Sequence, residues 1–296
     1  MALDPNAVGA HGPLREIEWT VKDTLLYAVG IGAGRDDLAF TTENSVGIEH
    51  QVYPTFAVVA GLEGTELDRT ALGHIGSFDP ALLVHGTQAV TLYRPIPADG
   101  AATSQDRIVA LYDKGKAAVV VVRTETASAD GSRLWSLESS AYIRGAGGWG
   151  GDRGPSGPRN EPPDRAPDDE VTMTVSPDQA FVYRLSGDRN PLHTDPAFAA
   201  KGGFDRPILH GLCTFGFTGR ALLRALCQDK VERLEHIEGR FSAPVWPGET
   251  LTVRCWRVAG GQAVFTTAVG DRTVLDQGLA RFREGERVPS EPFSTN

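Results

Sequence analysis

Three shortages in this sequence each exclude a class of protein. The 296 residues include three cysteines, Cys213, Cys227 and Cys255, whose spacing fits neither a metal site nor a disulfide framework, so we expect reduced packing residues. No segment approaches the roughly 18 apolar residues that a membrane span needs. The net charge of -9 argues against nucleic acid or an anionic membrane surface as a partner, because both require an electropositive face.

Signals for export and for several kinds of catalysis are also missing. The first residues contain neither a basic n-region nor an apolar h-region, which predicts a protein that stays where it is made, in the cytoplasm. No Gly-x-Ser-x-Gly elbow supports a serine nucleophile. No group of His, Cys, Asp and Glu has metal-ligand spacing along the chain, so we expect no metal site.

A segment rich in glycine and proline divides the chain almost in half. Residues 145–170 contain seven glycines before Pro158 and further prolines at 162, 163 and 167, a composition that sustains neither a helix nor a strand ladder. We therefore predict an N-terminal domain at 1–144, a linker at 145–170 and a C-terminal domain at 171–296.

Both halves read as a helix followed by strands. In the first half Thr20 and Asp23 predict a capping box before a helix over 21–29. The apolar run 55–60 fits a helix or a buried strand equally well. Four strands with intervening turns are predicted at 87–93, 106–112, 116–126 and 133–143.

The second half repeats this order. Ser176 and Gln179 predict a capping box and a helix over 177–185, and an apolar helix follows over 212–226. Four further strands are predicted at 237–241, 250–258, 263–269 and 274–282.

The two halves also align by residue. The run Tyr27-Ala28-Val29-Gly30-Ile31-Gly32 matches Tyr183-Arg184-Leu185-Ser186-Gly187-Asp188, and Val84-His85-Gly86 matches Leu209-His210-Gly211. Gly32 then takes the position of Asp188, and Asp37 that of His193. The first copy therefore lacks the pair of titratable groups, which predicts one active site per chain and a structural role for His85.

The loop between Gly187 and His193 carries the candidate chemistry. Asp188 and His193 are five residues apart with Pro191 between them, so they cannot share a helix face, but a loop can turn both toward one water. A carboxylate and an imidazole so placed can act as general acid and base, and the Asn190 amide could orient that water or fix the loop. The alternative is a turn without function, since Gly, Asp, Asn and Pro all favour turns.

His210 and Gly211 come directly before the apolar helix of the second half. The Gly211 N–H is unshielded at the positive end of that helix and can meet an oxyanion. For His210 we favour a structural role over a functional one.

The same residues resemble a known family. Residues 183–199 match the hydratase 2 signature of the MaoC-like (R)-specific enoyl-CoA hydratases at every fixed position, with Gly187-Asp188, Asn190-Pro191 and His193. Residues 203–216 closely resemble the hydratase 2 domain of peroxisomal multifunctional enzyme type 2. The likeness also covers residues 27–34, 84–86, 147–151 and 241–248.

This resemblance implies an α+β protein with a double hot-dog fold, in which each repeat wraps an antiparallel sheet around a central helix. It implies reversible addition of water to trans-2-enoyl-CoA, giving (3R)-3-hydroxyacyl-CoA, with no metal or redox cofactor and with a homodimer as the assembly. By position, Asp188 and His193 would activate the water, Asn190 would help to place it, and the Gly211 N–H would hold the thioester oxygen.

The phosphates of an acyl-CoA substrate need cations, and several lie near the signature in sequence. They are Arg184, Arg189, Lys201, Arg206 and Arg220. Of these we take Arg189, Lys201 and Arg206, together with His210, as the substrate-binding candidates. Three alternatives remain: a dehydratase acting on carrier-protein thioesters, a non-catalytic acyl-CoA-binding protein, and a hot-dog thioesterase.

Overall fold

The computed structural model describes residues 2–62, 70–79, 82–157 and 159–285. Its main feature is one ten-stranded antiparallel sheet with the strand order β2-β5-β6-β7-β4-β9-β12-β11-β10-β8. The first five of these strands are β2 (Arg15–Trp19), β5 (Gly100–Asp113), β6 (Ala117–Ala127), β7 (Arg133–Arg144) and β4 (Leu83–Leu92). The other five are β9 (Leu234–Phe241), β12 (Arg272–Phe282), β11 (Gln262–Val269), β10 (Thr250–Ala259) and β8 (Asp169–Thr174).

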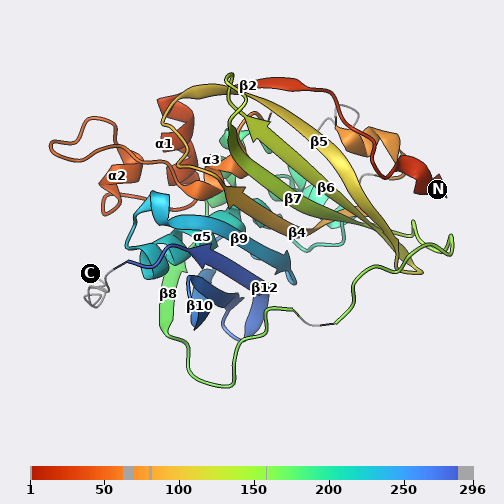
Figure 1. Ribbon diagram of the computed structural model, residues 1–296. Helices are drawn as coiled ribbons and strands as arrows, with labels where there is room; N and C mark the ends of the chain where they lie inside the picture. Colours follow the sequence, from red (N-terminus) through yellow and green to blue (C-terminus); the bar gives the residue numbers. More distant parts are fainter. Residues whose placement is uncertain (1, 63–69, 80–81, 158, 286–296) are drawn as a thin grey trace.

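The two halves of the chain meet where β4 pairs with β9. Thr87 lies opposite Arg240, and Thr91 lies opposite His236. Figure 1 shows β4 beside β9, with β5, β6 and β7 on one side of the pair and β12 on the other. This β4–β9 seam makes one continuous sheet from two sequence-local sets of strands.

All eight predicted strands are present, with ends that differ by a few residues. The structure adds β2 and β8 as the edges of the large sheet, and a small pair formed by β1 (Ala2–Leu3) and β3 (Gly76–Ser77). β2 begins at Arg15 and pairs along β5. Periodicity did not predict these two edge strands, because the exposed side chains of β2 and β8 are polar and neither strand contains an apolar run.

The helices are few and short apart from one. They are α1 (Val21–Gly30), α2 (Leu38–Thr41), α3 (Gln179–Tyr183), α4 (Pro196–Lys201) and α5 (Gly211–Cys227). The 3-10 turns are η1 (Pro5–Ala7), η2 (Pro54–Val58), η4 (Ala71–His74), η6 (Arg184–Ser186), η7 (Pro191–His193) and η8 (Val231–Arg233). Within the described residues, none of the helices is both long and apolar enough to cross a bilayer.

Helix α5 is the central helix of the fold, and it confirms the prediction over 212–226. It contacts β8, β9, β10 and β12 (Figure 1), and its buried apolar side chains include Phe215, Phe217 and Leu222. It ends at Cys227, and the left-handed conformation of the next residue, Gln228 (φ 58°), caps the last turn.

Within its described residues, the first half has no helix of this length at the corresponding place. Its ambiguous apolar run forms the short η2, in which every residue from Pro54 to Val58 is buried. η2 packs directly on α5 because Gly219 has no side chain; a Cβ there would lie 2.5 Å from Thr55 Cγ2. Through η2, which also contacts β4 and β7, the first half of the chain packs against the same helix.

Of the two predicted capping boxes, one is confirmed. Thr20 N donates to Asp23 Oδ2 at 2.8 Å at the start of α1. The second is wrong: α3 begins at Gln179, whose side-chain amide instead donates to Gly30 O (2.6 Å) and Val29 O (3.0 Å) at the end of α1. A contact across 149 residues has replaced the local one.

Between β7 and β8 the described residues form no helix or strand. Asp113 fixes the start of this segment, because its carboxylate accepts from the backbone N–H groups of Gly115, Gly148 and Gly150. These bonds hold the pKa of Asp113 down at about 2. Farther along, the Asn160 amide donates to Glu238 Oε1 on β9 at 2.9 Å.

Candidate active site

The predicted catalytic loop follows α3 and η6 and depends on Gly187 for its direction. Gly187 has φ +122°, and a Cβ at this position would collide with the carbonyl oxygen of Leu62. Only glycine allows the chain to turn here without strain. Asp188 follows immediately and is partly exposed.

Asn190 fixes the remainder of this loop. Its backbone N–H donates to Asp188 Oδ1 at 3.1 Å, and its side-chain Oδ1 accepts from Leu192 N at 3.0 Å, which caps η7. His193 is the last residue of η7. Asn190 therefore sets the relative positions of Asp188 and His193, and its side-chain NH₂ remains as a donor.

His193 has the protonation pattern of a base. Its Nδ1 lies 2.9 Å from Ile208 O, and a carbonyl oxygen can only accept, so Nδ1 carries the hydrogen and Nε2 has a free lone pair. Burial lowers the pKa of His193, while Asp188 and the Ile208 carbonyl oppose that shift. The ring is therefore neutral near pH 7 and able to take a proton.

His210 lies behind His193 in the interior. Its side chain is fully buried, its ring stacks on that of His193 with centroids 3.8 Å apart, and its Nε2–H donates to Asp188 O at 3.1 Å. Burial lowers its pKa to about 2, with the neighbouring His193 adding to the effect. His210 thus stays neutral and anchors the backbone of Asp188, which favours the structural alternative over substrate binding.

Gly211 is the first residue of α5, so its N–H has no acceptor within the helix. The ring of Phe241 lies beside it, with Cε1 3.3 Å from the place that a Cβ on Gly211 would occupy. His210 and Gly211 are adjacent, so the bond from His210 to Asp188 connects the catalytic loop directly to the start of α5. The helix N-terminus favours a negative charge at this point.

The predicted cations divide into two groups. Arg189, Lys201 and Arg206 are exposed and make no ion pair within the part of the chain that the structure describes. Arg206 lies over the Trp246 ring at 5.8 Å. Arg220, in contrast, is largely buried and pairs with Asp37 at 3.1 Å, which removes it from the phosphate-binding candidates.

In the first half of the chain, Asp37 occupies the position that aligns with His193. Its carboxylate is 3% exposed and also pairs with Arg224 at 2.9 Å, while Arg220 Nη1 donates to Gly32 O at 2.6 Å. Two arginines of α5 therefore fill the place that a second active site would need. Sequence reasoning identified the loss of the dyad there but not these partners, which lie more than 180 residues away.

His85 and His210 align in sequence but lie in different secondary structure. His210 precedes a helix, whereas His85 and Gly86 lie inside β4. The short match of three residues reflects similar sequence in different backbone conformations.

Three residues with potential metal-ligand atoms lie close together in space, although their spacing in the sequence did not indicate a metal site. Asp188, His193 and His210 can each place one such atom within 4.8 Å of the others. The two imidazoles, however, are stacked with an interplanar angle of 29°, so their ring-plane lone pairs are poorly directed toward a shared ion. The arrangement suits proton transfer at Asp188 and His193 better than metal binding.

Two family models match the chain in succession. The MFE-2 hydratase 2 N-terminal domain matches residues 17–145, and the MaoC like domain matches residues 159–278. A 3-hydroxyacyl-thioester dehydratase Y of Mycobacterium tuberculosis is 45% identical over 96% of this chain and 100% of its own. A probable enoyl-CoA hydratase 2 of Dictyostelium discoideum is 38% identical over 95% of this chain and 97% of its own.

Solved structures agree with these relatives. The crystal structure of a MaoC-like dehydratase from Phytophthora capsici has a TM-score of 0.85 and 32% identity, covering 95% of this chain and 98% of that one. A Mycobacterium tuberculosis protein with a double hotdog fold has a TM-score of 0.54 at 13% identity, covering 92% of this chain and 96% of that one, a likeness of fold alone. The predicted α+β double hot-dog architecture is confirmed, and the chain belongs to the MaoC-like hydratase 2 family.

Proposed function

We propose that this protein is an (R)-specific enoyl-CoA hydratase, a hydro-lyase that adds water reversibly to trans-2-enoyl-CoA and forms (3R)-3-hydroxyacyl-CoA. The observation that carries the proposal is the neutral His193, whose free Nε2 lies in one loop with the Asp188 carboxylate. Relatives named as enoyl-CoA hydratase 2 and as 3-hydroxyacyl-thioester dehydratase support the same chemistry in its two directions.

Hydration forms a bond from the water oxygen to C3 of the enoyl group and a bond from a proton to C2. Asp188 and His193 together remove one proton from the water and return one to C2, so neither residue is changed after a turnover. As C3 is attacked, electrons move through C2 to the thioester oxygen. The Gly211 N–H and the N-terminus of α5 stabilise this enolate charge.

The side-chain NH₂ of Asn190 is placed to donate to the attacking water, since its oxygen already caps η7. The exposed cations Arg189, Lys201 and Arg206 supply charge for the phosphates of CoA at the outer end of the site. The cytoplasmic location, the homodimer and the domain limits at 1–144 and 171–296 stay predictions.

The proposal is tested with crotonyl-CoA and a longer enoyl-CoA, with chiral analysis of the product. Asp188→Asn and His193→Gln should each reduce kcat by at least roughly 100-fold while the circular dichroism spectrum stays that of the wild type. Near-normal activity in either variant, or a 3S product, would refute the assignment.

A dehydratase acting on carrier-protein thioesters is the nearest alternative, because it uses the same dyad in the reverse direction. Comparing rates on CoA and carrier-protein thioesters of the same acyl group separates the two. A thioesterase would release free CoA thiol, and a non-catalytic binding protein would bind acyl-CoA without turnover.

A further inference from the structure

The first half of the chain contributes a third imidazole to the surroundings of the dyad. His85 lies in β4 next to the β4–β9 seam, and its ring packs on that of Phe241, the last residue of β9, with centroids 4.9 Å apart. Phe241 in turn lies beside Gly211. A contact chain therefore runs from the N-terminal half to the start of α5.

The ring of His85 is held in one orientation by its own strand. The pairing of β4 with β7 is irregular between His85 and Thr87, and Gly86 at this bulge has no room for a side chain, because a Cβ would lie 2.7 Å from Ser140 Oγ. The bulge turns the His85 ring back so that Nε2–H donates to Thr87 O at 3.0 Å. Few other orientations could keep this bond and the contact with Phe241.

The Asp188 carboxylate also interacts electrostatically with the His85 ring. Burial lowers the pKa of His85, while the Thr87 carbonyl, the Asp188 carboxylate and Gln88 oppose the shift. His85 is therefore neutral near pH 7 and lies within electrostatic reach of the catalytic carboxylate. A residue that the repeat alignment marked as structural faces the site of the other repeat.

We infer that His85 is a positioning residue: it holds the Phe241 ring against Gly211 and thereby sets how the thioester oxygen approaches the Gly211 N–H. Phe241 is only partly buried and ends its strand, so without the His85 ring it can rotate toward Gly211 or away from it. Displacements of about 1 Å at a reacting centre can cost on the order of 100-fold in rate. The inference rests on the proposed hydratase activity.

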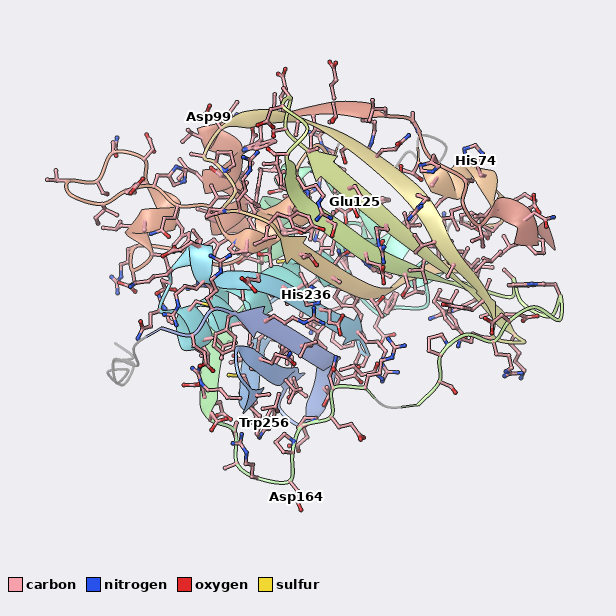
Figure 2. All side chains as sticks on the ribbon, viewed as in Figure 1. His74, Asp99, Glu125, Asp164, His236 and Trp256 are labelled. Atoms are coloured by element: carbon pink, nitrogen blue, oxygen red, sulfur yellow. The ribbon has the colours of Figure 1, made fainter. Side chains whose placement is uncertain are left out.

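The test is the kcat of His85→Ala on crotonyl-CoA, compared with His236→Ala. His236 is a matched control because it lies on the same seam, near the opposite end of β9 (Figure 2), where it bonds to Thr91 Oγ1 at 2.8 Å. We expect His85→Ala to lower kcat and kcat/KM together by roughly 10- to 100-fold, and His236→Ala to leave kcat within about two-fold of the wild type. A kcat for His85→Ala within that same margin would overturn the inference.

A double-mutant cycle separates this role from general support of the fold. If His85 acts through Phe241, the combination of His85→Ala with Phe241→Ala should cost little more than Phe241→Ala alone; independent, multiplying effects would contradict the inference. His85→Phe keeps a ring against Phe241 and should retain more activity than His85→Gln, which keeps only a polar group. This pair of variants carries the test if His85→Ala does not fold, and the reverse order of activities overturns the inference.

His193→Gln in the same assay separates a failure of the proposed hydratase function from a failure of the inference about His85. If the wild type hydrates crotonyl-CoA and His193→Gln does not, the proposed function stands whatever His85→Ala does. If the wild type is inactive on every enoyl thioester, the proposed function itself fails.

Discussion

The Nε2–H of His210 donates to the backbone oxygen of Asp188 at 3.1 Å. Because His210 is also the residue before α5 and the stacking partner of His193, one side chain connects the carboxylate, the imidazole and the oxyanion donor. The three groups proposed to act on the substrate are held together by a fourth that is fully buried.

Removing this connection should impair catalysis more than folding alone would explain. In His210→Ala the partly buried Asp188 oxygen loses its donor, at a cost of at most about 1–3 kcal/mol, and the Asp188 backbone is free to shift. We expect kcat to fall by at least roughly ten-fold with a smaller change in KM. Steady-state kinetics below the melting temperature of the variant measure this, and His210→Gln, which restores a donor, should recover part of kcat. A variant that is destabilised but fully active would show that the bond serves stability only.

Stability should decrease as the pH falls below about 6.5, the ordinary pKa of histidine. Burial lowers the pKa of His193 and of His210, the latter to about 2, so between their folded and unfolded pKa values the unfolded chain binds protons that the folded chain excludes. Stability from these groups is complete above pH 6.5 and is lost as the pH falls, for His210 by up to about 1.4 kcal/mol per pH unit. Urea unfolding between pH 7 and pH 5 tests this; a free energy of unfolding that does not change over this range would contradict it.

The network around Asp37 should matter for stability and not for the chemical step. Asp37→Asn removes the charge shared by Arg220 and Arg224, whose side chains are 16% and 28% exposed. Breaking a fully buried pair costs about 3–5 kcal/mol, and the partial exposure of the arginines reduces our expectation to about 2 kcal/mol.

The control for Asp37→Asn is Glu138→Gln. Glu138 pairs with Arg123 at 2.6 Å between side chains that are 43% and 45% exposed, so its loss should cost less than about 1 kcal/mol. Chemical denaturation compares the two variants. Equal effects would mean that burial of Asp37 adds nothing.

Gly187 should be irreplaceable for a steric reason beyond its backbone angle. Gly187→Ala places a Cβ against Leu62 O at φ +122°, whereas Gly203→Ala, at φ +83°, meets nothing within 4 Å. Gly203→Ala should lose about 1–2 kcal/mol of folding stability, because alanine is strained in a left-handed conformation, and it should stay active. Gly187→Ala should lose more stability and most of its hydratase activity, because the turn that presents Asp188 must move. Thermal melts and kcat of the two variants, measured together, check this difference.

Much of the fold followed from local patterns. The eight predicted strands lie between turn signals, α5 follows its apolar face from Gly211 onward, and α1 has the capping box of Thr20 and Asp23. These features depend on residues a few positions apart, which is why periodicity and turn chemistry could locate them. The second capping box failed because the Gln179 amide bonds to Gly30 O instead of to its own helix.

The sequence by itself determined the loop that carries Asp188, Asn190 and His193, since its turn residues and their spacing are local, and it also showed that the first copy lacks the dyad. Only the tertiary structure decided that His210 bonds to the Asp188 backbone, that two α5 arginines pair with Asp37, and that His85 packs on Phe241. Those contacts join segments from 22 to more than 180 residues apart. They depend on how β4 and β9 close the sheet around α5, and no short-range pattern in the sequence encodes that packing.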